Sequence, residues 1–302
     1  MNNYWCKMAY DTLKIIRPLM KIASHIAPRA TGNLAFKLFC TPPQANNLTA
    51  AQKKLISRAE IRLAEAQRLR VPFKGGWVET YRFQTSHAVS LGTVLLLHGW
   101  SSRAAFMSAF IEPLQTAGFD VVAVDLPGHG LSSGRELHVA LGVAALHAVE
   151  ATIGPSQFII AHSFGGALAT SFVAGTIKPF PAVAVKRLVL IAAPNSIPDL
   201  FWWFGRSAGL SPRAQHWFNA NVVRLTGNNL EAFVAGNLLR QPPIKTLVLH
   251  APDDKEVAYS NAEGIAAAGD HIELHALPGL GHRRIVYAPV TVATTLSFLT
   301  AE

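Results

Sequence analysis

The pattern of apolar and polar positions divides the chain near residue 69. In residues 1–40, apolar residues recur at the three- and four-residue spacing of an amphipathic helix, and lysines recur every seven residues. After a proline-containing turn, Leu48–Leu69 continues with a second helical pattern. We therefore expect an N-terminal helical extension over residues 1–68 and a second domain over residues 69–302. The apolar positions are Ile15, Ile16, Leu19, Ile22 and Ile26, and the lysines are Lys7, Lys14 and Lys21.

From residue 69 onward, short apolar runs bounded by turn residues alternate with helical patterns. Two early runs predict a hairpin, and the later alternation favours a mostly parallel eight-stranded α/β sheet with helices on both faces. The expected strands are Leu69–Lys74, Trp77–Gln84, Thr93–His98, Asp120–Asp125, Gln157–Ala161, Arg187–Ala192, Lys245–His250 and His271–Leu277. The expected helices are Arg103–Ala117, Leu137–Ala151, Phe164–Thr176, Val257–Ala268 and Tyr287–Leu299.

The alternation stops once, between Ala193 and Pro243. This stretch lacks a clear strand pattern but holds many aromatic residues, including Phe201, Trp202 and Trp203. We expect a helical insertion over about residues 194–243. Its aromatic side chains either form a small core of their own or cover a site on the sheet.

Residues Ala161–Gly166 carry the strongest chemical signal. A short apolar run ends here and a helical pattern begins, so Ser163 sits in a sharp strand-to-helix turn between small residues. Such a turn projects the hydroxyl away from the sheet, but a hydroxyl needs a base within reach to act as a nucleophile. Ser163 is therefore a candidate nucleophile, and the simpler alternative is an ordinary serine in a helix-opening turn.

Candidate partners for Ser163 follow the last two expected strands. His282 lies in the loop after the eighth strand and is a candidate general base. Asp253 and Asp254 follow the seventh strand, and either could hold the histidine in the required tautomer; Asp199 is a more remote alternative. The chain order is therefore Ser, Asp, His, with each residue placed just after a strand.

This order, together with Val94–Trp100 and Val121–Gly130, resembles the α/β-hydrolase family over roughly residues 70–300. The segments Pro252–Val257 and Gly279–Arg284 resemble a bacterial subgroup of esterase- and lipase-like serine hydrolases. The family spacing Gly-x-x-Asp-x-x-Val favours Asp254, with Ala251 in place of the glycine. Ala161 likewise stands where the family has a glycine two residues before the serine.

The resemblance implies roles for particular residues. Ser163, His282 and Asp254 would form a catalytic triad, and the backbone N–H groups of Trp100 and Phe164 would form the oxyanion hole. The family inserts a cap after its sixth strand. We therefore interpret residues 194–243 as a helical cap whose Phe201, Trp202 and Trp203 line a substrate pocket.

The net charge of +9 is confined to the N-terminal quarter of the chain. Residues 1–74 hold 13 Lys and Arg residues against 3 Asp and Glu residues, whereas residues 75–302 hold 14 against 15. A basic amphipathic helix is able to lie on an anionic membrane. The alternative is that the extension packs on the hydrolase domain with its lysines in water. No nucleic-acid-binding motif accompanies the basic charge, so we expect no nucleic-acid partner.

The remaining composition narrows the compartment and the chemistry. Cys6 and Cys40 lie in the N-terminal segment, far along the chain from the candidate site residues, and no apolar run approaches the length of a spanning helix. Charged residues interrupt any signal-peptide core near the N-terminus. We expect a cytoplasmic protein, with peripheral membrane contact as the open alternative. The sequence shows no metal-ligand or cofactor motif, so we expect no metal and no cofactor.

The combined pattern predicts a serine hydrolase for a small-molecule carboxylic ester or thioester with an apolar acyl group. A C–C bond hydrolase or a lactonase would use the same triad. A non-catalytic protein of this fold that binds a lipid or a partner is the alternative from another functional class.

Overall fold

The computed structural model describes residues 7–43, 50–241 and 243–301. Residues 1–6 with Cys6, and residues 48–49 of the second expected helix, lie outside the described residues. The described chain forms an eight-stranded sheet in the order β1-β2-β4-β3-β5-β6-β7-β8, which confirms the expected fold class. The strands are β1 (Gln67–Phe73), β2 (Gly76–Phe83), β3 (Thr93–Leu97), β4 (Asp120–Val124), β5 (Phe158–His162), β6 (Arg187–Ile191), β7 (Lys245–His250) and β8 (Ile272–Ala276).

The sheet is antiparallel only at its first edge. β1 and β2 form the expected hairpin, and β2 also pairs antiparallel with β4. The other neighbouring strands, from β4 through β3 to β8, run parallel. The carboxyl ends of these parallel strands therefore meet at one edge, which is where ligand sites form in open α/β sheets.

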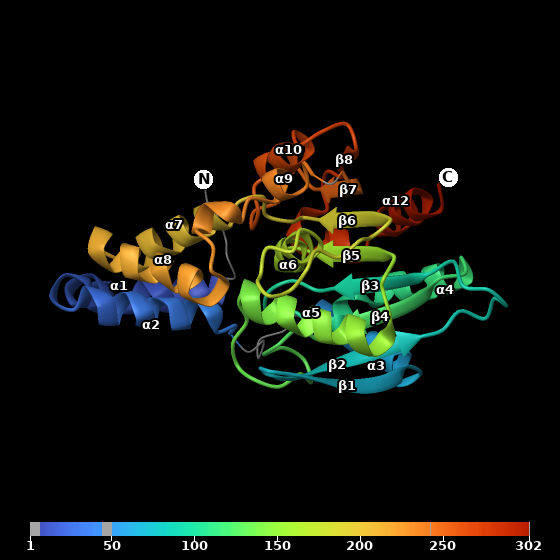
Figure 1. Cartoon of the computed structure of the whole chain (residues 1–302), viewed down its shortest axis with the longest axis horizontal. Helices are drawn as coiled ribbons and strands as arrows, with labels where there is room; N and C mark the ends of the chain where they lie inside the picture. The colour runs from blue at the N-terminus through green and yellow to red at the C-terminus, as the bar shows by residue number, and fades with distance from the viewer. Residues whose placement is uncertain (1–6, 44–49, 242, 302) are drawn as a thin grey trace.

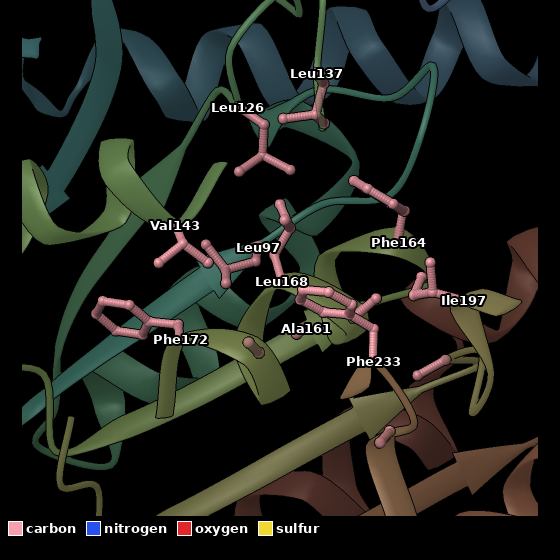
Figure 2. Packing of buried hydrophobic residues seen from close by; sticks show 14 of the residues in the cluster. Leu97, Leu126, Leu137, Val143, Ala161, Phe164, Leu168, Phe172, Ile197 and Phe233 are labelled. Atoms are coloured by element: carbon pink, nitrogen blue, oxygen red, sulfur yellow. The ribbon is translucent and has the colours of Figure 1, made fainter. Parts of the chain in front are cut away.

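Helices cover both faces of the sheet because both faces of its central strands are apolar. In β3, Leu95 and Leu97 join one core cluster, while Val94 and Leu96 join the cluster on the opposite face. Figure 2 shows the first cluster, in which Phe172 and other apolar helical side chains lie over the strands. Its helices include α5 (Val139–Ile153), α6 (Phe164–Val173) and α10 (Ser260–Ala266). The second cluster receives α3 (Ala50–Ala64), η1 (Ala104–Phe110), α4 (Ile111–Thr116) and α12 (Pro289–Thr300).

Two expected helices differ from the structure, one in where it ends and the other in helix type. The second N-terminal helix ends at Ala64 rather than Leu69, because residues 67–69 pair with β2 as the start of β1. The single helix expected over Arg103–Ala117 is a 3-10 helix followed by a short α-helix. Pro113 lies in the first turn of α4, where its missing N–H has no intrahelical partner to lose.

The expected helical insertion lies between β6 and β7. It contains α7 (Ile197–Ala208), α8 (Pro212–Thr226), a 3-10 turn η2 (Leu230–Ala232) and α9 (Ala235–Leu238). The N-terminal segment forms α1 (Lys7–Ile26) and α2 (Pro28–Cys40). Figure 1 shows α1, α2, α7 and α8 gathered beyond the arrowheads of β3, β5 and β6, at the carboxyl edge of the sheet. Across the described chain, no helix has both the length and the apolar composition needed to cross a bilayer.

The N-terminal helices and the insertion form one packed unit. Gly32 of α2 lies so close to α8 that an added Cβ would be 2.5 Å from the carbonyl oxygen of Ala214. The Ser211 N–H donates to Ser24 Oγ at 3.1 Å, and the Ser211 hydroxyl donates to the Ser24 carbonyl at 2.7 Å. Phe36 and Phe39 of α2 pack against aromatic rings of α7 and α8. The extension is therefore an integral layer over the carboxyl edge of the sheet.

Candidate active site

Ser163 lies at the apex of the turn between β5 and α6, in a backbone conformation that L-residues rarely adopt. Its φ is +52° and its ψ is −123°, and its N–H donates to the Ile191 carbonyl at 2.9 Å. Glycines make this turn possible on the helix side. A Cβ at Gly165 would lie 2.6 Å from the His98 carbonyl oxygen, so α6 could not approach β3 as closely with any other residue. Strained backbone conformations such as this positive φ are found most often at functional sites.

The loop after β3 closes directly over this turn. A Cβ at Gly99 would lie 2.9 Å from Ser163 Cβ and 3.0 Å from His162 Nδ1. The ring of Trp100, the next residue, packs edge-on against Phe164 with 5.5 Å between ring centres. Trp100 and Phe164, whose backbone N–H groups are the predicted oxyanion donors, thus lie on the two segments that flank Ser163. Phe164 is also the first residue of α6, where the helix dipole favours negative charge.

Two buried neutral histidines hold this loop in place. His98 Nδ1–H donates to the Gly99 carbonyl at 2.7 Å, and its Nε2 accepts from the Leu126 N–H at 3.0 Å. His129 Nε2 accepts from the Ser101 N–H at 3.0 Å. Burial lowers the pKa of His98 to about 4 and that of His129 to about 3. Both rings are therefore neutral near pH 7, which leaves each with one nitrogen to accept and one to donate.

The structure brings Ser163, His282 and Asp254 together from three separate loops. His282 Nε2 lies 3.0 Å from Ser163 Oγ, and His282 Nδ1 lies 2.8 Å from Asp254 Oδ2. Both distances are within hydrogen-bonding range, and the order of contacts is that of a nucleophile, a base and an orienting acid. The His282 side chain is 8% exposed and that of Asp254 is fully buried, so water has little access to the hydrogen bond between them.

Asp254, and neither of its alternatives, contacts His282. Its Oδ1 accepts hydrogen bonds from the N–H groups of Glu256 and Val257 at 2.7 and 2.9 Å. Exposed Asp253 instead accepts from the Gly279 N–H at 2.7 Å, and Asp199 lies on the exposed first turn of α7.

The surroundings of Asp254 favour its charged form. Burial alone would raise the pKa of this carboxyl, but hydrogen bonds from His250 and His282 outweigh burial and hold the pKa well below its ordinary value. Buried His250 contributes Nε2, which lies 3.3 Å from Asp254 Oδ2 and 2.9 Å from the Val257 carbonyl oxygen. Sequence reasoning missed His250, because its place at the end of β7 is typical of a packing residue.

Asp125 belongs to the framework of the site. Its carboxylate accepts from the backbone N–H groups of Ala104 and Leu131 and from the Tyr81 hydroxyl. Burial raises the pKa of this carboxyl. The carboxylate ties η1 and the turn after β4 to the sheet, as a cap of that turn.

An apolar pocket opens beside the nucleophile turn, and the empty space within it, including the part open to solvent, is about 410 Å³. Ser163 is not among its lining residues, but the adjacent Phe164 is, and Figure 2 shows Phe164 near Ile197 and Phe233. The wall comes from six parts of the chain: Phe36, Phe39 and Cys40 of α2; His138, Val139 and Ala140 at the start of α5; Phe164 of α6; Ile197 and Phe201 of α7; Val222, Leu225 and Thr226 of α8; and Phe233 after η2.

Only one of the three predicted pocket aromatics lines this cavity. Phe201 is 4% exposed and forms part of the wall. Trp202 is 58% exposed and carries the Arg206 guanidinium over its ring at 4.8 Å, while Trp203 packs against the edge of the core. The reason is helical geometry, since consecutive residues on α7 point about 100° apart. Sequence reasoning missed the contribution of α2, although the apolar face of its sequence was a usable signal.

The described part of the chain, residues 7–43, 50–241 and 243–301, contains no group of three or more His, Cys, Asp or Glu residues placed to hold a metal ion. Cys40, which lines the cavity, is a buried free thiol, and burial raises its pKa.

Comparisons with known proteins place this geometry in a family. Human serine hydrolase-like protein is 36% identical over 106 residues, which cover 33% of this chain and 49% of that protein. The pimeloyl-[acyl-carrier protein] methyl ester esterase of Vibrio parahaemolyticus is 26% identical over 150 residues, covering 49% of this chain and 54% of that protein. The match thus spans about half the length of these curated relatives.

Solved structures show the same fold at low sequence identity. The ferulic acid complex of Est1E from Butyrivibrio proteoclasticus matches with a TM-score of 0.62 and 16% identity, over 76% of this chain and 97% of that one. The esterase RhEst1 from Rhodococcus sp. ECU1013 matches with a TM-score of 0.57 and 20% identity, over 78% and 98%. The model of the alpha/beta hydrolase family matches residues 94–295. Since this match covers well over half of the 302 residues, the chain belongs to the alpha/beta hydrolase family.

Proposed function

We propose that this protein is a serine hydrolase that cleaves a carboxylic ester or thioester with an apolar acyl group. The observation that carries the proposal is the chain of contacts from Ser163 Oγ through His282 to Asp254, at 3.0 and 2.8 Å. Ester hydrolysis is also what the names of the Vibrio parahaemolyticus relative and of RhEst1 describe for those proteins.

The proposed reaction proceeds through an acyl-enzyme. His282 Nε2 takes the proton of Ser163 as its Oγ attacks the substrate carbonyl carbon. The backbone N–H groups of Trp100 and Phe164 then stabilise the negative oxygen of the tetrahedral intermediate. His282 returns the proton to the leaving alcohol or thiol, and the acyl group remains on Ser163. In the second half, His282 removes a proton from water as the water attacks the acyl carbon. The bond from this carbon to Ser163 Oγ then breaks, His282 returns the proton to Ser163 Oγ, and the acid leaves.

Asp254 supports His282 in both halves of this reaction. Its carboxylate accepts the Nδ1–H bond and so keeps Nε2 free to take a proton from Ser163. The low pKa of Asp254 means that the carboxylate remains charged when the neighbouring imidazolium forms, and it offsets that positive charge. Because the carboxylate is buried, this attraction is screened less than it would be in water.

The apolar cavity indicates the nature of the acyl group. Phe164 links the nucleophile turn to the cavity, so an acyl chain attached to Ser163 would extend between the walls supplied by α2 and α8. Most wall residues are aliphatic or aromatic, which favours a hydrocarbon chain over a charged or sugar-like group. The leaving group would lie on the side away from the cavity.

The test is hydrolysis of p-nitrophenyl esters from acetate to palmitate, with Ser163→Ala as the blank. We expect a chain-length optimum in the wild type and its loss in the blank, with unchanged circular dichroism. A fluorophosphonate probe should label the wild type and fail to label Ser163→Ala. Activity retained in Ser163→Ala would overturn the proposal, as would a wild type that neither labels nor hydrolyses any ester or acyl thioester of the series.

A further inference from the structure

Helix α1 carries a row of large apolar side chains that face solvent. Ile15, Leu19, Ile22 and Ile26 are 78%, 72%, 61% and 79% exposed. Their spacing of four, three and four residues places them on a single stripe of the helix. The opposite side of α1 holds buried Met20 and Ser24, which face the rest of the protein. The helix thus has two apolar faces, of which the residues that the structure describes cover one.

Helix α2 also exposes apolar side chains. Leu34 and Leu38 are 50% and 40% exposed, one helical turn apart. The other side of α2 holds buried Ala35 and Phe36, which belong to the main core cluster. On α1, the side bearing Arg17 and Lys21 lies against Gly209 at the end of α7, so the exposed row is turned away from α7. Figure 1 shows α1 and α2 side by side as the outermost layer of this end of the molecule.

Beyond residue 11, the charged residues of α1 and α2 are all basic. Residues 12–43 contain five Lys and Arg residues and no Asp or Glu. Arg17, Lys21, Arg29 and Lys37 are all exposed on α1 and α2. Arg17 and Lys21 lie on the side of α1 toward Gly209, and the Arg29 guanidinium lies over the Trp217 ring. A hairpin with an exposed apolar row and with only basic charges beyond residue 11 is complementary to a surface that offers acyl chains below a layer of negative headgroups. If a second copy of this chain bound through the same surface, the positive charges of the two copies would face and repel each other.

We propose that the α1–α2 hairpin is the membrane-docking surface of this protein and lies in the interface of an anionic lipid bilayer. The six exposed apolar side chains enter the boundary between headgroups and acyl chains, and the net positive charge of the hairpin is attracted to the negative headgroups. The docking surface consists of Ile15, Leu19, Ile22, Ile26, Leu34 and Leu38.

Docking would also place the candidate active site next to the lipid, a consequence that rests on the proposed function. Phe36, Phe39 and Cys40, on the inner side of α2, line the apolar cavity beside Ser163. The width of one helix, about 10 Å, thus separates the docking surface from the cavity. A membrane-dissolved acyl ester or thioester would reach the cavity around the edge of α2, without crossing bulk water.

The test is co-sedimentation of the full chain with sucrose-loaded vesicles of phosphatidylcholine, with or without 30% phosphatidylglycerol as the anionic lipid. Using Ser163→Ala as the background prevents turnover of the vesicle lipids. We expect strong binding to the anionic vesicles, at least tenfold weaker binding to phosphatidylcholine alone, and weaker binding in 0.5 M NaCl. Leu19→Glu/Ile22→Glu should reduce the partition coefficient at least tenfold.

The matched control is Leu131→Glu/Val290→Glu, which alters two exposed apolar residues outside the hairpin and should bind like the background. The same substitutions should also be made in the protein that retains Ser163. Without vesicles, they should change neither its circular dichroism nor its hydrolysis of soluble p-nitrophenyl butyrate. Binding that the hairpin substitutions leave intact would overturn the proposal. The proposal would also be overturned if the protein did not bind vesicles but formed a concentration-dependent dimer that the hairpin substitutions dissociate. Vesicle binding and ester hydrolysis are separate readouts, so the failure of one proposal does not imply failure of the other.

Discussion

His162 Nε2 donates a hydrogen bond across 2.9 Å to the backbone carbonyl of His282, which joins the residue before the candidate nucleophile to the candidate base. Their rings also pack with 4.9 Å between centres. Burial lowers the pKa of His162 to about 3, so its ring is neutral and a single N–H makes this bond. The loop that carries His282 is thus anchored directly to the turn that carries Ser163.

His162→Phe is therefore expected to reduce ester hydrolysis through kcat. The ring keeps its packing, but the His282 carbonyl loses its donor, and small displacements of a catalytic group reduce rate steeply. We expect kcat to fall about tenfold or more with little change in KM. The control is His147→Phe, on α5, whose ring packs on Phe180 and whose buried Nε2 has no hydrogen-bond partner to lose. Equal kcat in the two folded variants would contradict this role.

Asp254→Asn should impair hydrolysis far more than Asp253→Asn. The amide at residue 254 no longer accepts reliably from His282 Nδ1–H and disfavours the tautomer that leaves Nε2 free, an effect of about 10⁴-fold on kcat in serine proteases. Asp253 only accepts from the Gly279 N–H on the exposed side of the loop, so its replacement should change kcat less than about tenfold. Steady-state kinetics on p-nitrophenyl butyrate measures both. If Asp253→Asn lowered kcat more than Asp254→Asn, the acid that orients His282 would be Asp253.

Val222→Phe should shorten the acyl chain that is hydrolysed best. Val222 is 7% exposed and lines the cavity, so a larger ring takes up space that an acyl chain would occupy. Val223, the next residue of α8, is 44% exposed and provides the matched control as Val223→Phe. The p-nitrophenyl ester series is the measurement. An unshifted optimum in folded Val222→Phe would place the acyl chain outside this cavity.

The free energy of unfolding should decrease as the pH falls from 7 toward 5. His98, His129 and His162 have folded-state pKa values near 4, 3 and 3, below the ordinary value of 6.5. Between these values and 6.5 the unfolded chain binds more protons, so lowering the pH favours unfolding. The expected loss is about 2 kcal/mol for each histidine between pH 7 and 5.

Urea titrations at several pH values measure this dependence. His129→Asn keeps a donor near the Pro127 carbonyl but does not titrate, so it should show a shallower slope than the wild type. A free energy of unfolding that stays constant from pH 7 to 5 would contradict the neutral buried state of these rings.

Local sequence was sufficient for the sheet and for the turn that carries Ser163. Continuous apolar runs such as residues 94–97 are buried on both faces, and this pattern depends only on the strand itself. Small residues around Ser163 make a tight turn possible wherever the chain places it. Ser163, Asp254 and His282 each follow an expected strand, so the sequence also indicated which loops carry them.

Only the tertiary structure decided what surrounds that turn. The choice between adjacent Asp253 and Asp254 depends on which carboxylate the loop after β7 turns toward His282, and the sequence favoured Asp254 only through the family spacing. The cavity wall depends on the packing of α2 against α8, two segments that are distant in sequence. Because α1 and α2 each carry two apolar faces, their patterns could not show which face packs inward. Phe36 is buried beside the cavity while Leu34 is left in solvent, since close contact at Gly32 sets how α2 is rotated on α8.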